Sequence, residues 1–198
     1  MPQVGYKIFI GTAHRPLRNR LKLIFQQRGY TVIGEAEDSP ACLRIIRRLM
    51  PDLVILDQEL PGIPGIDVAK IIAEDKLAPV ILLTPTWEKT LFDKAKDSWI
   101  FAFLVKPIQE GHLLSTAAFV LHTFHKMQKL EKQVDSLKES LETRKIVEKA
   151  KGILMEKDSL TEGEAYKRMR QQSMDRCISL KQVAGEIISA FEKSQKEK

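Results

Sequence analysis

Residues 51–68 read PDLVILDQELPGIPGIDV and combine a fully apolar run with a set of turn residues. The run at 53–56, LVIL, has no polar position, which is typical of a strand covered on both faces of a parallel sheet. Asp57 ends this run, and the Pro and Gly residues between 61 and 65 indicate a loop before the next helix. The stretch therefore predicts a buried strand with a carboxylate at its carboxyl end.

Similar apolar runs occur on both sides of this strand, separated by amphipathic helical patterns. We expect strands at residues 6–10, 31–34, 53–56, 80–84 and 101–105, and helices at 17–28, 40–49, 67–72 and 89–96. Strands that alternate with helices predict an α/β domain over residues 1–124. Its sheet is expected to be doubly wound and flavodoxin-like, with five parallel strands.

A long helix is expected next, because neither Pro nor Gly occurs between Gly111 and Gly152. Within it, residues 112–145 form a linker with apolar side chains at the a and d positions of one heptad frame. We call this set the heptad seam; it consists of Val120, Met127, Leu130, Val134, Leu137 and Leu141. The seam favours a coiled coil between two copies of the chain; the alternative is a helix that packs on its own domain.

The C-terminal residues 141–194 predict a small bundle of three helices. The end of the long helix supplies the first helix, and Thr161 and Glu164 form a capping box that opens the second. Ser179 is placed to cap the third. Such a short bundle has a thin core and depends on its neighbours for stability.

The composition of the 198 residues excludes several classes of protein. Two cysteines, Cys42 and Cys177, are too few for a disulfide framework or a four-cysteine zinc site. The sequence contains no apolar run of membrane-spanning length and no signal-peptide pattern, so we expect a cytoplasmic protein without a membrane segment. The net charge is +6, and residues 126–198 contribute +4 of it, which is compatible with a polyanionic partner.

Three polar residues follow strand ends and are expected to converge at one edge of the sheet: Asp57, Thr84 and Lys106. A carboxylate there can accept a phosphoryl group while the hydroxyl and the ammonium hold its oxygens. Together with Phe103, these positions resemble the receiver domain of bacterial response regulators. The resemblance implies that Asp57 is the candidate phosphoacceptor and that Thr84, Phe103 and Lys106 complete the pocket.

One part of that pattern is missing. Receiver domains carry an acidic pair after the first strand, which binds Mg²⁺ together with the phosphoacceptor, whereas Thr12 and Ala13 occupy these places here. We therefore expect the magnesium site to be lost and no cofactor to be bound, with His14 or Arg15 lying against Asp57. The alternative is a working receiver that binds Mg²⁺ and is phosphorylated by a sensor kinase.

The last third of the chain resembles the ANTAR domain, an RNA-binding module of transcription antitermination regulators. Residues 150–152 (AKG), Arg144, Arg170 and Met174 fit its pattern, and Ser173 stands where the family usually has Ala. The RNA-binding candidates are Arg144, Lys145, Lys149, Lys151, Gly152, Lys167, Arg168, Arg170, Arg176 and Lys181. Tyr166 is interpreted as a core residue, with stacking on an unpaired base as the alternative.

The two resemblances together imply a signal-responsive regulator. Such a protein binds stem-loops in nascent transcripts as a homodimer, joined by the coiled coil, and prevents a terminator from forming. A protein-binding adaptor is the main alternative, and a DNA-binding regulator is less favoured because no helix-turn-helix spacing occurs. Neither a catalytic triad nor a Gly-rich phosphate loop is recognisable, so no catalytic residue and no enzymatic activity are expected.

Overall fold

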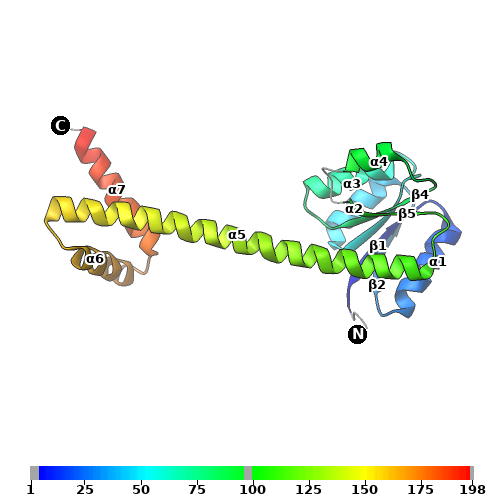
Figure 1. Ribbon diagram of the computed structural model, residues 1–198, viewed down its shortest axis with the longest axis horizontal. Helices are drawn as coiled ribbons and strands as arrows, with labels where there is room; N and C mark the ends of the chain where they lie inside the picture. The colour runs from blue at the N-terminus through cyan, green and yellow to red at the C-terminus, as the bar shows by residue number, and fades with distance from the viewer. Residues whose placement is uncertain (1–4, 96–99, 197–198) are drawn as a thin grey trace. The chain divides into compact units, whose positions relative to one another are not determined.

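The computed structural model describes residues 5–95 and 100–196, and of residues 92, 94–95 and 194–196 only the backbone is described. The chain forms two compact units, residues 1–127 and 128–198. The helix α5 (Glu110–Asp158) contributes to both of them (Figure 1). Each unit has its own hydrophobic core and is described separately.

The N-terminal unit is built on one parallel sheet. Its strands run from Lys7–Gly11 (β1), Thr31–Ala36 (β2), Leu53–Asp57 (β3), Val80–Thr84 (β4) and Ile100–Val105 (β5), in the spatial order β2-β1-β3-β4-β5. Every residue of β3 and β4 is buried, as expected for central strands covered on both faces. The predicted doubly wound α/β fold is confirmed.

Helices cover both faces of this sheet. On one face, α1 (Arg15–Gln27) and the first turns of α5 pack on Ile8, Ile10 and Ile55. On the other face, α2 (Ser39–Leu49) and α3 (Gly65–Glu74) pack on Phe9, Val54 and Leu56, and α4 (Lys89–Ala95) follows β4. Successive strand residues point to opposite faces, so β1 supplies side chains to both cores.

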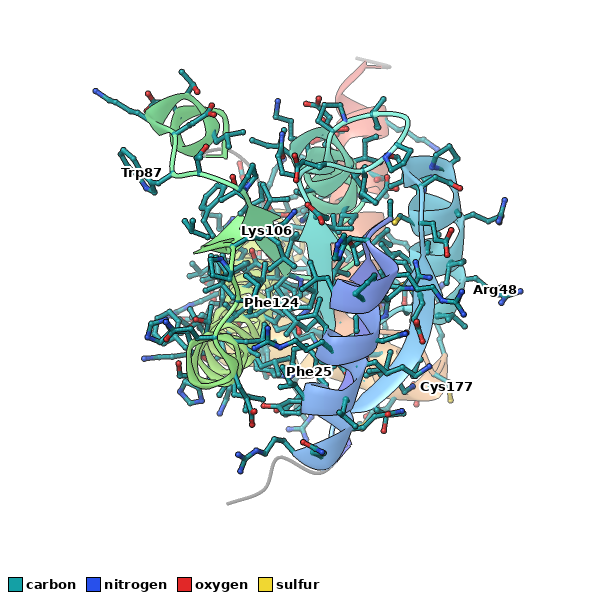
Figure 2. The ribbon with its side chains drawn as sticks, turned by 90° about the vertical axis from the view of Figure 1, so that its right-hand side faces the viewer. Phe25, Arg48, Trp87, Lys106, Phe124 and Cys177 are labelled. Carbon is teal, nitrogen blue, oxygen red and sulfur yellow. The ribbon has the colours of Figure 1, made fainter. Side chains whose placement is uncertain are left out.

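Large apolar side chains define the α1–α5 core. Phe25 of α1 and Phe124 of α5 are 0% and 5% exposed and lie in this layer, whereas Trp87 points away from the unit (Figure 2). Val120 is also fully buried in this core. Its assignment to the heptad seam was wrong, because the first turns of α5 cover the sheet and leave Val120 no exposed surface for a second chain.

The C-terminal unit contains the end of α5, α6 (Glu162–Asp175) and α7 (Leu180–Lys196). Its small core consists of Val147, Ala150, Leu154, Ala165, Met169, Val183 and Ala184. The capping box at the start of α6 is present, with Thr161 and Glu164 bonded reciprocally. Gly152 lies inside α5 and does not end it, since this helix continues to Asp158.

Candidate functional site

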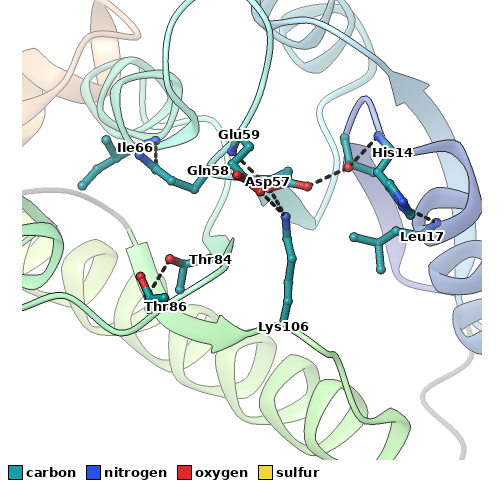
Figure 3. Close-up of polar contacts among 10 residues, drawn as sticks. His14, Leu17, Asp57, Gln58, Glu59, Ile66, Thr84, Thr86 and Lys106 are labelled. Carbon is teal, nitrogen blue, oxygen red and sulfur yellow. Dashed lines mark hydrogen bonds and ion pairs between the residues drawn. The ribbon is translucent and has the colours of Figure 1, made fainter.

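Asp57 lies at the end of β3, only 2% exposed, and its carboxylate is fully engaged. Lys106 Nζ donates to Oδ1 at 2.8 Å, and the backbone N–H of Glu59 donates to the same oxygen at 3.1 Å. The hydroxyl of the buried Thr12 donates to Oδ2 at 2.8 Å (Figure 3). Both oxygens of the candidate phosphoacceptor therefore have hydrogen-bond donors from this chain.

Lys106 is shared between two carboxylates. Its Nζ also lies 3.0 Å from Oε2 of Glu59, whose side chain is largely in solvent. Burial by itself lowers the pKa of Lys106, but the hydrogen bonds and charges of Asp57 and Glu59 outweigh it and raise the pKa above its usual value. The lysine therefore remains charged. Sequence analysis missed Glu59, because its contact depends on the path of the loop after β3.

The other two predicted pocket residues, Thr84 and Phe103, make their contacts elsewhere. The Thr84 hydroxyl donates to the carbonyl oxygen of Thr86 at 2.7 Å and is turned away from Asp57 (Figure 3). Phe103 is half-buried and packs against the core on the α2–α3 face. The strand ends thus bring Thr84 and Lys106 to the edge of the sheet where Asp57 lies. Of these two, Lys106 bonds to the carboxylate, whose other oxygen is bonded to Thr12.

The expected contact of His14 or Arg15 with Asp57 was wrong. His14 is the N-cap of α1, and its Nδ1 accepts a hydrogen bond from the backbone N–H of Leu17 at 3.1 Å. Arg15 is exposed at the first position of the helix. Neither side chain has a hydrogen bond or an ion pair to Asp57 in the described part of the chain. Thr12 takes the place that they were expected to fill.

A buried arginine supports the Thr12 loop. Arg18 is 8% exposed, and its guanidinium donates to the carbonyl oxygen of Thr12 at 2.9 Å. It also pairs with Glu37 at 2.5 Å and with Glu35 at 3.5 Å. Arg18 was not predicted, although a charged residue between the core positions Leu17 and Leu21 of α1 was a signal for it.

The C-terminal candidates divide into two groups according to their partners. Lys151 is 7% exposed, and its Nζ lies 2.9 Å from Glu148 and 2.7 Å from Glu162. Three more of the candidates form ion pairs within the unit: Lys149 with Glu192, Arg168 with Asp158, and Arg176 with Glu186. These four cations are neutralised by acidic residues of the same chain.

Five further candidates, here called the unpaired cations, have no ion pair with a described residue: Arg144, Lys145, Lys167, Arg170 and Lys181. Lys181 is half-buried and the other four are exposed. Gly152, the remaining candidate, is an exposed position of α5. The positive charge that is available for binding a polyanion therefore lies on the unpaired cations, which are half of the predicted RNA-binding residues.

Sequence comparison identifies both units. The response regulator receiver domain matches residues 8–118, and the ANTAR domain matches residues 135–188. The transcriptional regulatory protein PdtaR of Mycobacterium tuberculosis is 35% identical over 188 residues, which cover 95% of this chain and 92% of PdtaR. The chain belongs to the ANTAR-type response regulators.

Other relatives of this ANTAR-type regulator match its receiver unit. The transcriptional regulatory protein YdfI of Bacillus subtilis is 31% identical over 111 residues, which cover 56% of this chain and 52% of YdfI. A two-component response regulator of the LuxR family from Aurantimonas sp. SI85-9A1 is 25% identical, with a TM-score of 0.56 over 60% of this chain and 86% of that one. The protein is thus a transcriptional regulator of the antitermination family.

Tyr166 of the ANTAR unit is not a core residue, contrary to the preferred interpretation of the sequence. Its side chain is 43% exposed and lines a groove of about 520 Å³ together with Arg144, Ser140 and Thr143. A second groove of about 520 Å³ is lined by Lys138, Lys145 and Lys181 together with Leu141, Glu139 and Glu142. The core of the unit is completed by small and aliphatic side chains, which leave the ring of Tyr166 at the surface.

The remaining seam residues differ from Val120. Met127 is half-buried, whereas Leu130, Val134, Leu137 and Leu141 are 52%, 47%, 65% and 59% exposed. These four exposed residues, here called the exposed seam, follow the a and d positions of α5 on an otherwise polar stretch.

No helix within the described residues is long and apolar enough to span a membrane.

Proposed function

We propose that the ANTAR unit binds RNA stem-loops in nascent transcripts and thereby promotes antitermination in the cytoplasm. The observation that carries the proposal is that unpaired cations line two grooves of the unit, one of which also contains the exposed ring of Tyr166. Arg144 and Tyr166 line one groove, and Lys145 and Lys181 line the other. Proteins bind single-stranded RNA loops through cations that contact the phosphates and aromatic rings that stack on the bases. The two grooves offer both kinds of group.

The division of the cations supports this assignment. A lysine or arginine that already pairs with a carboxylate must give up that pair before it neutralises a phosphate, so its net gain is small. The unpaired cations carry no such cost. We therefore assign the phosphate contacts to Arg144, Lys145 and Lys181 and a structural role to Lys151 and Arg176.

We further infer that the receiver unit works without Mg²⁺. A Mg²⁺ ion requires several oxygen ligands in a nearly octahedral arrangement, and carboxylates after β1 normally supply part of them. Thr12 offers one hydroxyl, which is already bonded to Asp57, and Ala13 offers no ligand. The ammonium of Lys106 occupies the other carboxylate oxygen. This donor set does not fit the ion, so we expect regulation by another input than metal-dependent phosphorylation.

The exposed seam supports a homodimer. Four large apolar residues about half exposed on one stripe would gain roughly 1 kcal/mol or more each when a second copy covers them. Two ANTAR units joined in this way would bind two stem-loops of one transcript. In this proposal the chain acts through binding and not as an enzyme.

The proposal is tested by fluorescence anisotropy with a labelled RNA that contains two stem-loops. The variants Arg144→Gln and Lys181→Gln remove unpaired cations, and Arg176→Gln is the matched control that removes a paired one. We expect each of the first two variants to weaken binding about fivefold or more at 100 mM salt and the control to weaken it by less than twofold. Equal losses in all three variants would contradict the assignment. Binding that does not change with salt would favour the protein-binding adaptor.

A further inference from the structure

A cavity of about 620 Å³ opens beside Asp57 in the receiver unit. One wall is the first two turns of α1, where Leu17 and Arg20 lie on the same face, and the opposite wall is the loop of Pro107 and Ile108 before α5. Figure 3 shows His14 and Leu17 across from Lys106. The volume falls within the range of sites for small molecules in proteins.

The missing acidic pair affects this cavity directly. Ala13 stands where a second carboxylate would be expected, and its methyl group lines the space. With Leu17, Pro107 and Ile108 it provides a mainly apolar lining. A cavity of this kind favours an occupant with an apolar body.

The charged residues that line the cavity differ in whether they have a partner within the chain. Asp57 accepts three hydrogen bonds, and Asp57 and Glu59 share the single ammonium of Lys106, so one cation serves both carboxylates. Arg20 has no ion pair or hydrogen bond to any described residue. His14 accepts at Nδ1 from Leu17, so its neutral ring carries the proton on Nε2 and can donate there. Two donors are thus available on the α1 wall.

We propose that this cavity binds a small organic monoanion with an apolar body. The anionic group pairs with the guanidinium of Arg20 and accepts a hydrogen bond from His14, and the apolar body rests on Leu17 and Ile108. Such a ligand would replace phosphorylation as the input to the receiver unit. The inference concerns this unit alone and does not depend on RNA binding by the ANTAR unit.

The proposal is tested by calorimetric titration of the full chain with sodium benzoate, which has one carboxylate on an apolar ring. Benzyl alcohol has the ring without the charge, and inorganic phosphate has the charge without the ring. We expect benzoate to bind about tenfold more tightly than either of them, because a charge-assisted hydrogen bond in a partly enclosed site contributes more than about 1.4 kcal/mol. Equal binding of phosphate and benzoate would overturn the proposal, and so would a complete lack of benzoate binding.

Variants locate the site. Arg20→Gln is expected to weaken benzoate binding about tenfold, whereas Arg20→Lys retains most of the affinity. Arg48→Gln is the matched control. Arg48 is an exposed arginine on α2 with no ion pair to a described residue (Figure 2), and its loss changes the net charge by the same amount. Weakening by Arg48→Gln equal to that by Arg20→Gln would show a general charge effect and overturn the site.

A second readout keeps the test independent of folding defects. Benzoate should shift the methyl NMR signals of Leu17 and Ile108 in the wild-type chain and leave those of Leu154 in the ANTAR unit unchanged. Ala13→Leu should abolish these shifts by filling the cavity, with its thermal unfolding followed to show that the unit is folded. Shifts that persist in a folded Ala13→Leu variant would contradict the proposed position.

Discussion

Asp57 illustrates how neighbouring residues decide what a carboxylate can do. In this chain one oxygen is bonded to Lys106 and the other to the hydroxyl of Thr12, and Arg18 holds the backbone of Thr12 in place. Both oxygens of this aspartate are thus occupied by hydrogen-bond donors of its own chain. A transferring phosphoryl group would have to displace at least one of them.

Restoring the acidic pair should restore metal-dependent chemistry at Asp57. We predict that Thr12→Asp/Ala13→Asp is phosphorylated by acetyl phosphate with Mg²⁺ about a hundredfold faster than the wild-type chain, because a bound cation stabilises the developing charge by several kcal/mol. The measurement is the intact mass over time. Adding Asp57→Ala to the double variant is the control and should remove the signal. Rapid Mg²⁺-dependent labelling of the wild type at Asp57 would refute the loss of the metal site.

The pair of Lys151 and Glu162 predicts a pH dependence of stability. Hydrogen bonding to Lys151 holds the pKa of Glu162 below its ordinary value of 4.5. A depressed pKa in the folded state contributes stability above pH 4.5, and this contribution is lost as the pH falls through the folded pKa. Lys151→Met should therefore lower the urea midpoint of the ANTAR unit at pH 7, and the difference from wild type should shrink as the pH falls below 4.5.

Lys157→Met is the control for this experiment, because Lys157 is exposed on the same helix and has no ion pair with a described residue. It should leave the midpoint nearly unchanged at both pH values. A difference between Lys151→Met and wild type that stays constant from pH 7 to pH 3.5 would rule out the Glu162 carboxylate as its source.

Single positions also show where sequence reasoning reached its limit. The strand ends correctly predicted that Asp57, Thr84 and Lys106 gather at one edge, because parallel strands place their carboxyl ends together. The hydrogen-bond partners could not be predicted. The start of α1 makes His14 an N-cap that bonds to Leu17 instead of Asp57, while the loop after β3 brings Glu59 to Lys106. Both contacts depend on loop paths that no periodic pattern encodes.

Helix α5 shows what a heptad pattern can and cannot predict. The a and d spacing correctly marks an apolar stripe, but it does not say what covers each residue. Val120 is covered by the sheet of its own unit, and the exposed seam from Leu130 to Leu141 has no cover within the described residues. The difference arises because α5 belongs to one core at its start and to another at its end.

The exposed seam predicts that a charged residue introduced into it weakens self-association. Leu137→Glu should prevent the proposed dimer from forming at micromolar concentration, because two carboxylates would face each other across the seam. Lys132→Glu is the control, since it adds the same residue at an outward position of the same helix. Sedimentation equilibrium distinguishes the two. A Leu137→Glu chain that remains dimeric would exclude the seam as the interface.

In the molecule as a whole, both units were identified from the sequence because their patterns are local. The alternation of strands and helices and the capping box at Thr161 each lie within short windows, and the structure has them within two residues of the expected positions. The ion pairs that neutralise Lys149, Arg168 and Arg176 join separate helices or helix ends. They could not be read from the order of the residues.

Joining two ANTAR units should affect RNAs with one and with two stem-loops differently. We predict that the wild-type chain binds a paired stem-loop RNA about 100-fold more tightly than a single stem-loop, since the second contact is intramolecular. Leu137→Glu should remove this difference and leave the affinity for the single stem-loop within about twofold. Anisotropy titrations of both RNAs with both proteins measure this. A paired-RNA advantage that survives in a monomeric variant would contradict the proposed role of the dimer.

If the exposed leucines on α5 hold two copies together, as proposed, the output also depends on how much protein the cell produces. If only the two-chain form can hold two hairpins, its abundance rises with the square of the chain concentration while most copies are single. A modest increase in protein synthesis would then cause a more than proportional increase in the number of transcripts in which the terminator does not form. The concentration of the protein would thereby set a threshold for antitermination, in addition to any molecule that the receiver unit senses.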